Sequence, residues 1–408
     1  MSVRGLTLPA LLLSLLLLAS LSPRSISASP DGPGWRPSSV ILIPEQTGQS
    51  AAVGINDNGT AVINGAAVYY NYTVSALMGY FAFYSGSFYS GPPINQPAYS
   101  VQLNSNFNAS GGMTLWAQNV FLVIYQNGVY NVSVVDNIWN STSSGSSLNQ
   151  SLVTGYGNFS TASGQVFYYD VAPRYYITGT PFYLYALMTI NLSASGYPTV
   201  FMYYRFVNST YDSGWIHYDT ITVLVPTNIT GFLTGLTGAY ATAPFVTQWV
   251  VCGAGGASQL NVTGWNATMA LYYQYNGKWY SVPDALSLQP SSFQGGVTGE
   301  TVNQYYGIQE YYNNQTGLVN QTQGQNLEEF LWQPNVTYVV NGNTLTLYLT
   351  PPKGEWLINV TGIGYSNTTF GQYSPVSFTL QPGNYTVYAT LYAGPNPVYT
   401  FTLNVTVS

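Results

Sequence analysis

Short runs of β-branched and aromatic residues, each bounded by turn-forming residues, recur along almost the whole chain. The clearest occupy residues 66–72, 112–125, 129–135, 182–192 and 215–225. Val, Ile, Tyr, Phe and Thr favour strands, whereas Asn, Gly, Ser, Pro and Asp at short intervals end them. We therefore predict an all-β protein whose first domain is a large β-sandwich or multi-sheet unit.

Two hairpins are indicated by Asn-Gly pairs. Asn127-Gly128 separates the runs at 121–125 and 129–135, and Asn276-Gly277 follows another Tyr-rich run. Asn-Gly is a favoured two-residue hairpin connection because both residues adopt positive φ readily. Only residues 327–332, with their two glutamates, suggest a helical turn.

A polar segment divides the chain. Residues 313–326 are mostly Asn, Gln, Gly and Thr, which is a composition typical of a connection. Beyond it, residues 336–408 hold about seven short alternating runs separated by turn residues, the rhythm of a small sandwich. We predict a first domain at 30–312, a linker at 313–335, and a structural or adhesive β-sandwich at 336–408.

The N-terminus has the pattern of a secretory signal. Arg4 supplies the basic region, and residues 6–21 form the apolar core. The small residues of Ser-Ile-Ser-Ala28 are typical of a cleavage site. A retained membrane anchor is the alternative, but the apolar core is short for a span. We predict that residues 1–29 are removed and that the mature chain is extracellular, without a transmembrane anchor.

Charged residues make up only 5% of the chain, against about 25% in ordinary soluble domains. Proteins that depend on paired carboxylates lose stability in acid, so a chain with few of them suits an acid medium. The alternative is a glycoprotein kept soluble by sugar, since Asn-x-Ser/Thr sequences are frequent. Seven basic residues also exclude a nucleic-acid surface.

Elimination leaves carboxylates as the chemistry-bearing groups. His217 is the only histidine and Cys252 the only cysteine, so a histidine-based metal site or catalytic triad is not expected, and neither is a cofactor. Two carboxyls held close share a proton, and the charged one can then activate water while the neutral one donates. Asp136, Asp170 and Asp219 each end or interrupt an apolar or Tyr-rich run, although closing a turn would explain each of them equally well.

Several motifs occur in a fixed order over residues 50–310: Trp116-Ala-Gln118-Asn119-Val120, Asp136-Asn-Ile-Trp139-Asn140, Phe167-Tyr-Tyr-Asp170, Pro181-Phe182, Tyr218-Asp219, Gly253-x-Gly-Gly256 with Ser258, and Thr298-Gly299-Glu300-Thr301. In this ordered set the chain resembles the thermopsin family of secreted archaeal acid proteases. The resemblance implies a pepstatin-sensitive endopeptidase that cleaves extended polypeptide beside bulky apolar side chains at low pH. The family usually has Glu where this chain has Gln248, and loss of a catalytic acid there would impair activity.

The catalytic pair is inferred from the residues themselves. Asp136 and Asp219 come first, Glu300 is the alternative partner, and Asp170 is the fourth candidate. We expect Gln118 and Asn119 to orient water or polarise the carbonyl, as amides do in oxyanion sites. Trp139 and Gln248 are expected to support substrate in a cleft lined by Tyr and Trp.

Two other functions remain open. A non-catalytic surface glycoprotein on the same scaffold would bind sugar or the cell envelope, and a glycoside hydrolase would also use two carboxylates. The distances between the acid side chains separate these possibilities. Scattered acids would favour the binding protein, and acids within reach of a shared proton would favour the protease.

Overall fold

The computed structural model describes residues 40–43, 52–57, 59–63, 66–143, 145–162, 164–228, 230–235, 247–283, 286–288, 300–303, 305–324, 329–332, 334–371 and 373–408. Strands dominate these residues, and the two short helices are 3₁₀ turns, η1 (Ser110–Gly112) and η2 (Gln150–Leu152). The all-β prediction is therefore confirmed. Within the described ranges, no helix has the length and apolarity needed to cross a membrane. The predicted signal segment lies outside the described residues.

One large sheet has thirteen strands in the described part of the chain. Its main path runs in the order β1 (Val40–Ile43), β25 (Glu329–Trp332), β21 (Leu286–Leu288), β2 (Val53–Asp57), β18 (Thr247–Cys252), β7 (Ala98–Ala109), β8 (Met113–Gln126), β9 (Val129–Asn140), β12 (Gln165–Val171) and β11 (Asn158–Ala162). β13 (Tyr175–Ile177), β17 (Phe232–Gly235) and β5 (Asn71–Val74) pair beside this path. We call it the first sheet.

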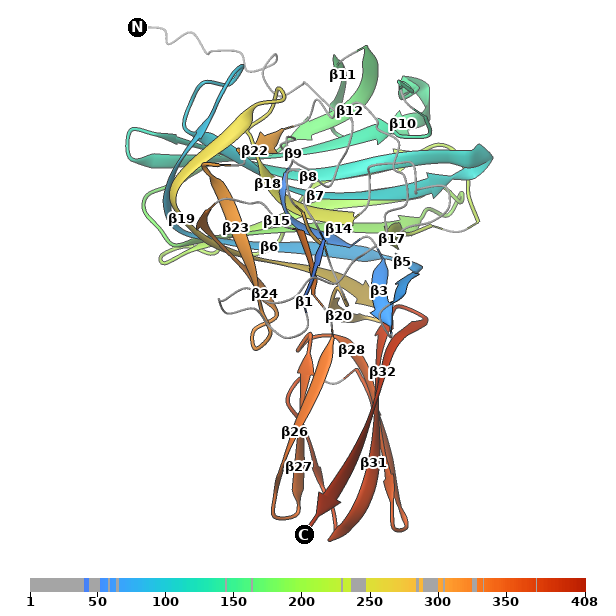
Figure 1. The fold of residues 1–408 in the computed structure, drawn as a ribbon. Helices are drawn as coiled ribbons and strands as arrows, with labels where there is room; N and C mark the ends of the chain where they lie inside the picture. Colours follow the sequence, from blue (N-terminus) through green and yellow to red (C-terminus); the bar gives the residue numbers. More distant parts are fainter. Residues whose placement is uncertain are drawn as a thin grey trace, which may run out of the picture.

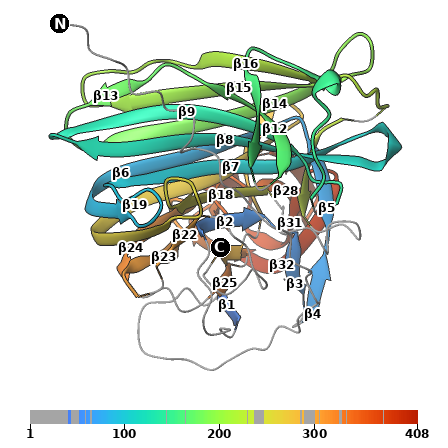
Figure 2. The same ribbon diagram turned by 90° about the horizontal axis from the view of Figure 1, so that it is seen from above.

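The second sheet has ten strands among the described residues. Its path runs in the order β10 (Val153–Thr154), β16 (Ile216–Val223), β15 (Pro198–Asn208), β14 (Phe182–Leu192), β6 (Ala76–Ser90), β19 (Gln259–Tyr275), β24 (Leu318–Gly324) and β23 (Gly307–Asn313), with β20 (Lys278–Ser281) and β22 (Thr301–Val302) beside β19. A separate ribbon pairs β3 (Thr60–Ile63) with β4 (Ala66–Tyr69). The two large sheets stack as layers of the main body (Figure 1), and their long strands run across it together when seen from above (Figure 2).

Alternation along the strands decides which side chains enter the space between the sheets. On β9, Val132, Val134 and Ile138 belong to the buried apolar core. Asp136 has the same parity and therefore faces the same interior, whereas Val135 and Asn137 face the other side of the first sheet. The core is rich in aromatic rings; Phe88 and Tyr99, for example, pack edge to face at 4.6 Å.

Both predicted hairpin turns are present. Asn127 and Gly128 have φ values of 53° and 80°, and the flanking Gln126 pairs with Val129. Asn276 and Gly277 have φ values of 49° and 75° between β19 and β20. Positive φ at both positions is the geometry that makes Asn-Gly favourable in a two-residue hairpin.

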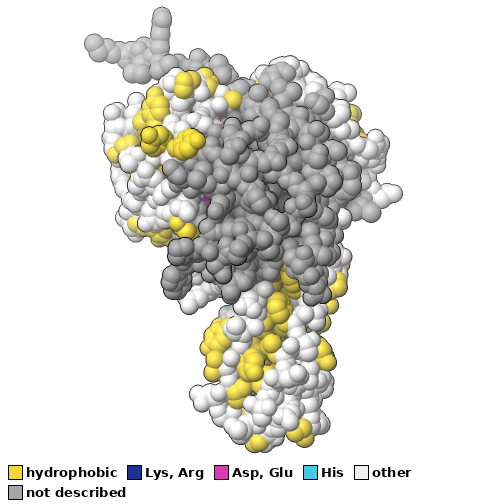
Figure 3. Space-filling model, viewed as in Figure 1, with side chains coloured by type: hydrophobic (Ala, Val, Ile, Leu, Met, Phe, Trp, Pro, Cys, Tyr) yellow, Lys and Arg dark blue, Asp and Glu magenta, His cyan; other side chains and the backbone are white. Residues whose placement is uncertain are grey.

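The C-terminal module, residues 334–408, lies below the main body in Figure 1. It has one sheet of β26 (Asn335–Asn341), β27 (Thr344–Thr350) and β30 (Val376–Thr379), and another of β29 (Tyr365–Phe370), β28 (Glu355–Gly362), β31 (Gly383–Ala393) and β32 (Asn396–Val407). Its own core includes Leu347, Trp356 and Val387. On the described part of the surface in Figure 3, apolar and neutral side chains predominate, as the 5% of charged residues requires.

The structure differs from the sequence prediction over residues 313–335. The segment expected to be a linker contains β24, which pairs with β19 and β23, and β25, which pairs with β1. The suggested helical turn at 327–332 is wrong, because Glu329–Trp332 is the strand β25. β24 is polar because several of its side chains are exposed, while Val319 and Gln321 face inward.

Candidate active site

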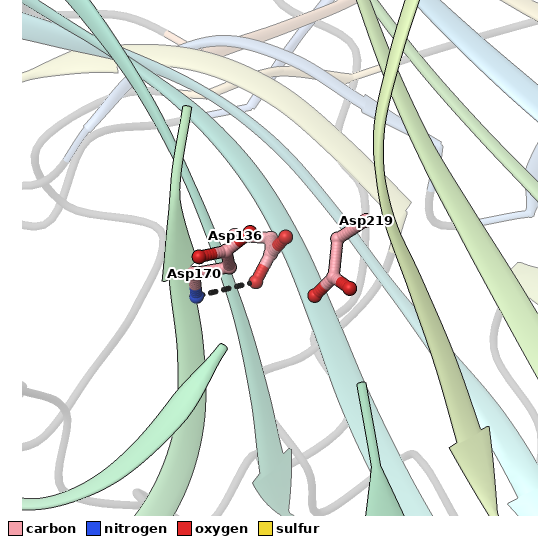
Figure 4. A group of neighbouring side chains, drawn as sticks. All are labelled: Asp136, Asp170 and Asp219. Carbon is pink, nitrogen blue, oxygen red and sulfur yellow. Dashed lines mark hydrogen bonds between the residues drawn. The ribbon is translucent and has the colours of Figure 1, made fainter. Parts of the chain in front are cut away.

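Three carboxyl groups meet between the two large sheets. Asp136 on β9 and Asp170 on β12 are directly opposite each other within the first sheet, and Asp219 comes from β16 of the second sheet. One carboxylate oxygen from each lies within 4.8 Å of the others. Figure 4 shows the carboxyl groups of Asp136 and Asp219 turned toward one another across the space between the sheets.

Alternation along β16 turns Asp219 inward, because the buried Ile221 and Val223 have the same parity, and a β-bulge precedes Asp219. The register between β15 and β16 shifts after Met202, which pairs with Asp219, so that Tyr203 pairs with His217 and Tyr218 is the extra residue. An extra residue breaks the alternation and lets two successive side chains point to one side. The bulge therefore lets Tyr218 point into the same interior as the completely buried Asp219, and the Tyr218 hydroxyl donates 3.1 Å to Asn119 Oδ1.

The two buried aspartates differ in their hydrogen bonds. Asp219 Oδ1 accepts from the backbone N–H groups of Tyr156 at 2.9 Å and Thr220 at 2.7 Å, and Asp219 Oδ2 accepts from the Tyr168 hydroxyl at 2.6 Å. Asp136 Oδ1 accepts from Asp170 N–H at 2.9 Å, while Asp136 Oδ2 is buried with no partner. Asp219 therefore accepts hydrogen bonds from three donors, whereas Asp136 accepts from one.

The electrostatics point the same way. Burial raises the pKa of Asp136 well above its ordinary value, and the nearby carboxyls of Asp219 and Asp170 raise it further. Burial also raises the pKa of the half-buried Asp170, with a further contribution from Asp219. At low pH the cluster therefore holds a neutral Asp136 beside a hydrogen-bonded Asp219, the division of roles that a carboxyl pair requires for acid and base chemistry.

The cluster suits a proton better than a metal ion. Its oxygens lie near enough together for one hard cation, which would prefer oxygen ligands. However, two N–H groups and one O–H group already occupy lone pairs of Asp219, which leaves fewer of them for a cation. Asp136 Oδ2 is buried without a hydrogen-bond partner, so a proton shared with Asp219 would satisfy it.

A family model described as Thermopsin matches residues 39–305 of this chain. This protein belongs to the thermopsin family. The thermopsin match includes all three clustered aspartates and ends before the C-terminal module. Thermopsins are a protease family, which supports a protease function and a polypeptide substrate for this chain. A search of curated proteins found no match.

The fourth predicted acid, Glu300, lies elsewhere in the thermopsin fold. It is half-buried in a pocket whose other walls include Gln102, Gln118, Val135 and Asn137. Because Val135 and Asn137 flank Asp136 on β9, this pocket is on the opposite face of the first sheet from the aspartate cluster. Burial raises the pKa of Glu300 to about 7, despite hydrogen bonds to backbone N–H groups that lower it. The structure does not bring Glu300 to Asp136.

The predicted amides also divide between the two faces. Asn119 is directly opposite Asp136, and its Nδ2 donates to the carbonyls of Tyr203 at 2.9 Å and Leu187 at 3.3 Å. Asn119 therefore ties the first sheet to the second beside the cluster. Gln118 faces the Glu300 pocket, where its Nε2 donates to Asn104 Oδ1 at 3.0 Å.

The two predicted substrate-support residues do not line the aspartate cluster. Trp139 is buried and stacks on Phe167 at 3.9 Å, and it lies three residues from Asp136, on the other face of β9. Gln248 on β18 pairs with Asn104 and belongs to the same row as Gln118. Their roles in this thermopsin stay predictions that belong to the Glu300 side of the sheet.

Residues that our sequence analysis missed complete the cluster. Tyr168 and Tyr156 donate to Asp219, and Tyr218 donates to Asn119. Tyr168 lies in the motif Phe167-Tyr-Tyr-Asp170, two residues from an acid and therefore on the same face of its strand. That spacing was a usable signal; for Tyr156, in a Gly-Tyr-Gly sequence, the chain offered none.

Proposed function

We propose that this thermopsin is an extracellular acid endopeptidase in which Asp136 and Asp219 share a proton and activate water. The observation that carries the proposal is the meeting of Asp136, Asp170 and Asp219 within 4.8 Å between two sheets. In a chain with only 13 acidic residues, bringing three of them together from β9, β12 and β16 supports a shared chemical role.

Each carboxyl has a distinct part in the proposed reaction. The Asp219 carboxylate, held by three donors, takes a proton from water as the water oxygen attacks the peptide carbonyl carbon. Neutral Asp136 donates its proton to the carbonyl oxygen, which gives a tetrahedral diol. Asp219 then protonates the nitrogen, the C–N bond breaks, and Asp136 recovers its proton as the new carboxyl forms. No cofactor enters this cycle.

The proposal includes an acid medium. Below the raised pKa of Asp136 that group is neutral and can donate, and ionising it beside Asp219 would place two charges in one buried site. Activity should therefore be lost as the pH rises toward neutrality. Secretion, glycosylation, inhibition by pepstatin and cleavage beside bulky apolar residues belong to the same proposal and follow from the signal pattern and the family.

One observation favours a second candidate, a binding protein at the cell envelope. Asp136 and Asp219 are both completely buried in this conformation, and a buried pair cannot touch a peptide. On the same scaffold, a cluster of that kind would only hold the sheets together. The protease therefore needs an opening movement, and the binding protein does not.

Hydrolysis of an unfolded protein separates the two. The purified chain is incubated with acid-denatured globin at pH 2–3 and at pH 7, and the products are identified by mass spectrometry. The protease produces new internal N-termini at pH 2–3 and few at pH 7, and pepstatin reduces them. Intact globin at both pH values, with the chain folded by circular dichroism, would leave the binding protein as the function.

A further inference from the structure

The chain changes sheets directly over the aspartate cluster. β10 pairs with β16 in the second sheet, and β11 pairs with β12 in the first. Gly155, Tyr156 and Gly157 join β10 to β11 and therefore cross from one sheet to the other; we call them the crossing segment. Asp219 on β16 and Asp170 on β12 lie on the two strands that the segment connects.

Two backbone N–H groups of the crossing segment hold it to the cluster. Tyr156 N–H donates 2.9 Å to Asp219 Oδ1, and Gly157 N–H donates 2.6 Å to the Tyr168 hydroxyl oxygen. The Tyr168 hydroxyl in turn donates 2.6 Å to Asp219 Oδ2. Tyr168 thus connects the crossing segment to the carboxyl group that the proposed reaction uses as its base.

The two glycines allow the crossing segment to lie this close. A Cβ atom on Gly155 would be 2.1 Å from the Tyr168 hydroxyl oxygen, and one on Gly157 would be 2.0 Å from the Tyr169 carbonyl oxygen. Both distances are far below van der Waals contact, so any side chain there would push the segment outward. Tyr156 between them is 71% exposed, so its ring adds little packing.

We propose that the crossing segment is a cover over the active site, and that Tyr168 is a positioning residue that holds Asp219 while the cover lifts. The proposal rests on the proposed protease function and supplies the opening movement that this function needs. Lifting breaks the two backbone hydrogen bonds, exposes Asp219 Oδ1 and leaves the bond from Tyr168 to Asp219 Oδ2 intact. A peptide group of an extended substrate can then take the place of Tyr156 N–H.

The balance of contacts favours local opening. A three-residue segment that is held by two backbone hydrogen bonds and carries an exposed ring has a low opening free energy relative to strands in the core. On β16 and β12, by contrast, Ile221, Val223 and Phe167 are buried. The segment can therefore move while the strands that carry Asp219 and Asp170 stay in place.

Amide hydrogen exchange tests the cover. In the wild-type chain at pH 3, the Tyr156 and Gly157 amides should exchange at least about tenfold faster than those of β12 and β16. Gly155→Ala and Gly157→Ala should accelerate them further, because the added methyl group pushes the segment outward. Gly91→Ala is the matched control, since a Cβ there meets nothing closer than 3.6 Å. If the Tyr156 and Gly157 amides exchange only as slowly as those of the core strands, the proposal of a cover is wrong.

The pH profile of hydrolysis tests Tyr168. Tyr168→Phe keeps the ring and removes one donor from Asp219, so kcat should fall and the pH profile of kcat/KM should differ from that of the wild-type chain. The groups that face Asp219 are otherwise unchanged: Asp136, Asp170 and the Tyr218 hydroxyl. Tyr385→Phe, which loses a 2.9 Å hydroxyl hydrogen bond to the Gln381 carbonyl in the C-terminal module, should keep the wild-type profile. A wild-type profile in Tyr168→Phe would overturn the positioning role.

The two proposals fail separately. If the amides of the crossing segment exchange quickly but no globin is cleaved, the protease function is wrong and the cover still closes a buried cluster. If globin is cleaved but these amides are as protected as the core, the protease stands and the cover is wrong.

Discussion

Tyr273 of the main body donates a 2.8 Å hydrogen bond to Glu355 Oε2 of the C-terminal module. Both side chains are completely buried, and Gly394 N–H also donates to Glu355 Oε2 at 3.1 Å. Glu355 Oε1 is buried without a partner. Tyr72 packs edge-on against Tyr273 at 5.1 Å and bonds through its hydroxyl to the buried Asp57. The junction therefore contains two buried carboxyls joined through two tyrosines.

The junction should make the protein most stable in acid. Burial raises the pKa of Glu355 to about 7 and that of Asp57 to about 6, against a lowering by their tyrosine hydrogen bonds. Between an unfolded pKa of about 4.3 and the folded value, the folded chain holds a proton that the unfolded chain has lost. The contribution of these carboxyls to the free energy of unfolding is therefore full below pH 4. It declines as the pH rises to 7, by up to about 3 kcal/mol for Glu355.

Glu355→Gln should reduce the loss of stability between pH 3 and pH 7. The amide oxygen can accept the same two hydrogen bonds and does not titrate, so unfolding midpoints in urea at pH 3, 5 and 7 should differ less than in the wild-type chain. Asp212→Asn is the matched control between pH 5 and 7, because Asp212 is exposed, ion-paired with Arg205, and with its pKa lowered to about 2 stays charged there. An unchanged pH dependence in Glu355→Gln would contradict this account of the junction.

Tyr273→Phe should extend the pH-dependent loss of stability to higher pH. The Tyr273 hydroxyl lowers the pKa of Glu355, so its loss raises that pKa above about 7 and leaves the carboxyl with Gly394 N–H as its remaining donor. Losing a buried hydrogen bond to a group that stays buried costs about 1–3 kcal/mol. Thermal unfolding at pH 5, 7 and 8 measures both effects. Wild-type stability at all three values would show that the bond is unimportant.

Glu300→Gln should keep hydrolytic activity within a few-fold of wild type. Its pocket lies across the first sheet from Asp136, so it cannot share a proton with that group. Rates on denatured globin at pH 3 measure the outcome. If this variant stays folded and loses activity while Asp136→Asn keeps it, the catalytic carboxyl is Glu300, with Gln118 beside it.

Gly79→Ala should destabilise the contact between the sheets without altering chemistry. A Cβ there would be 2.4 Å from the ring of Trp249, which is completely buried and donates through Nε1 to the Tyr80 carbonyl at 2.8 Å. Overpacking of this kind costs about 1–3 kcal/mol. The melting temperature should fall and kcat/KM should not, whereas Gly91→Ala should change neither. A wild-type melting temperature in Gly79→Ala would show that the ring moves freely.

Local patterns predicted the fold class and the two Asn-Gly hairpins, because strand propensity and turn geometry depend on neighbouring residues. Three of the four candidate acids lie together in the structure, namely Asp136, Asp170 and Asp219. They could be selected from the sequence because each interrupts a strand whose apolar residues face the core. The position of Glu300 depends on pairing between strands far apart in sequence, which composition does not encode. The face occupied by Trp139 was readable, since three residues along a strand reverse the direction of a side chain.

Two features could not be predicted from neighbouring residues, because they depend on strand pairing. The bulge brings Tyr218 inward beside Asp219, and it depends on the register between β15 and β16. The polar composition of β24 is that of a partly exposed strand, which resembles a linker when its partners β19 and β23 are unknown.

The most direct test of a proton shared by Asp136 and Asp219 is the rate of peptide release by single Asp-to-Asn variants. At pH 3, kcat/KM on denatured globin should fall by about 10²–10⁴-fold in both Asp136→Asn and Asp219→Asn, the contribution expected of a positioned acid or base. Asp212→Asn should keep wild-type activity, and circular dichroism and melting temperature verify the fold of each variant. Folded Asp136→Asn and Asp219→Asn proteins with wild-type kcat/KM would contradict the account.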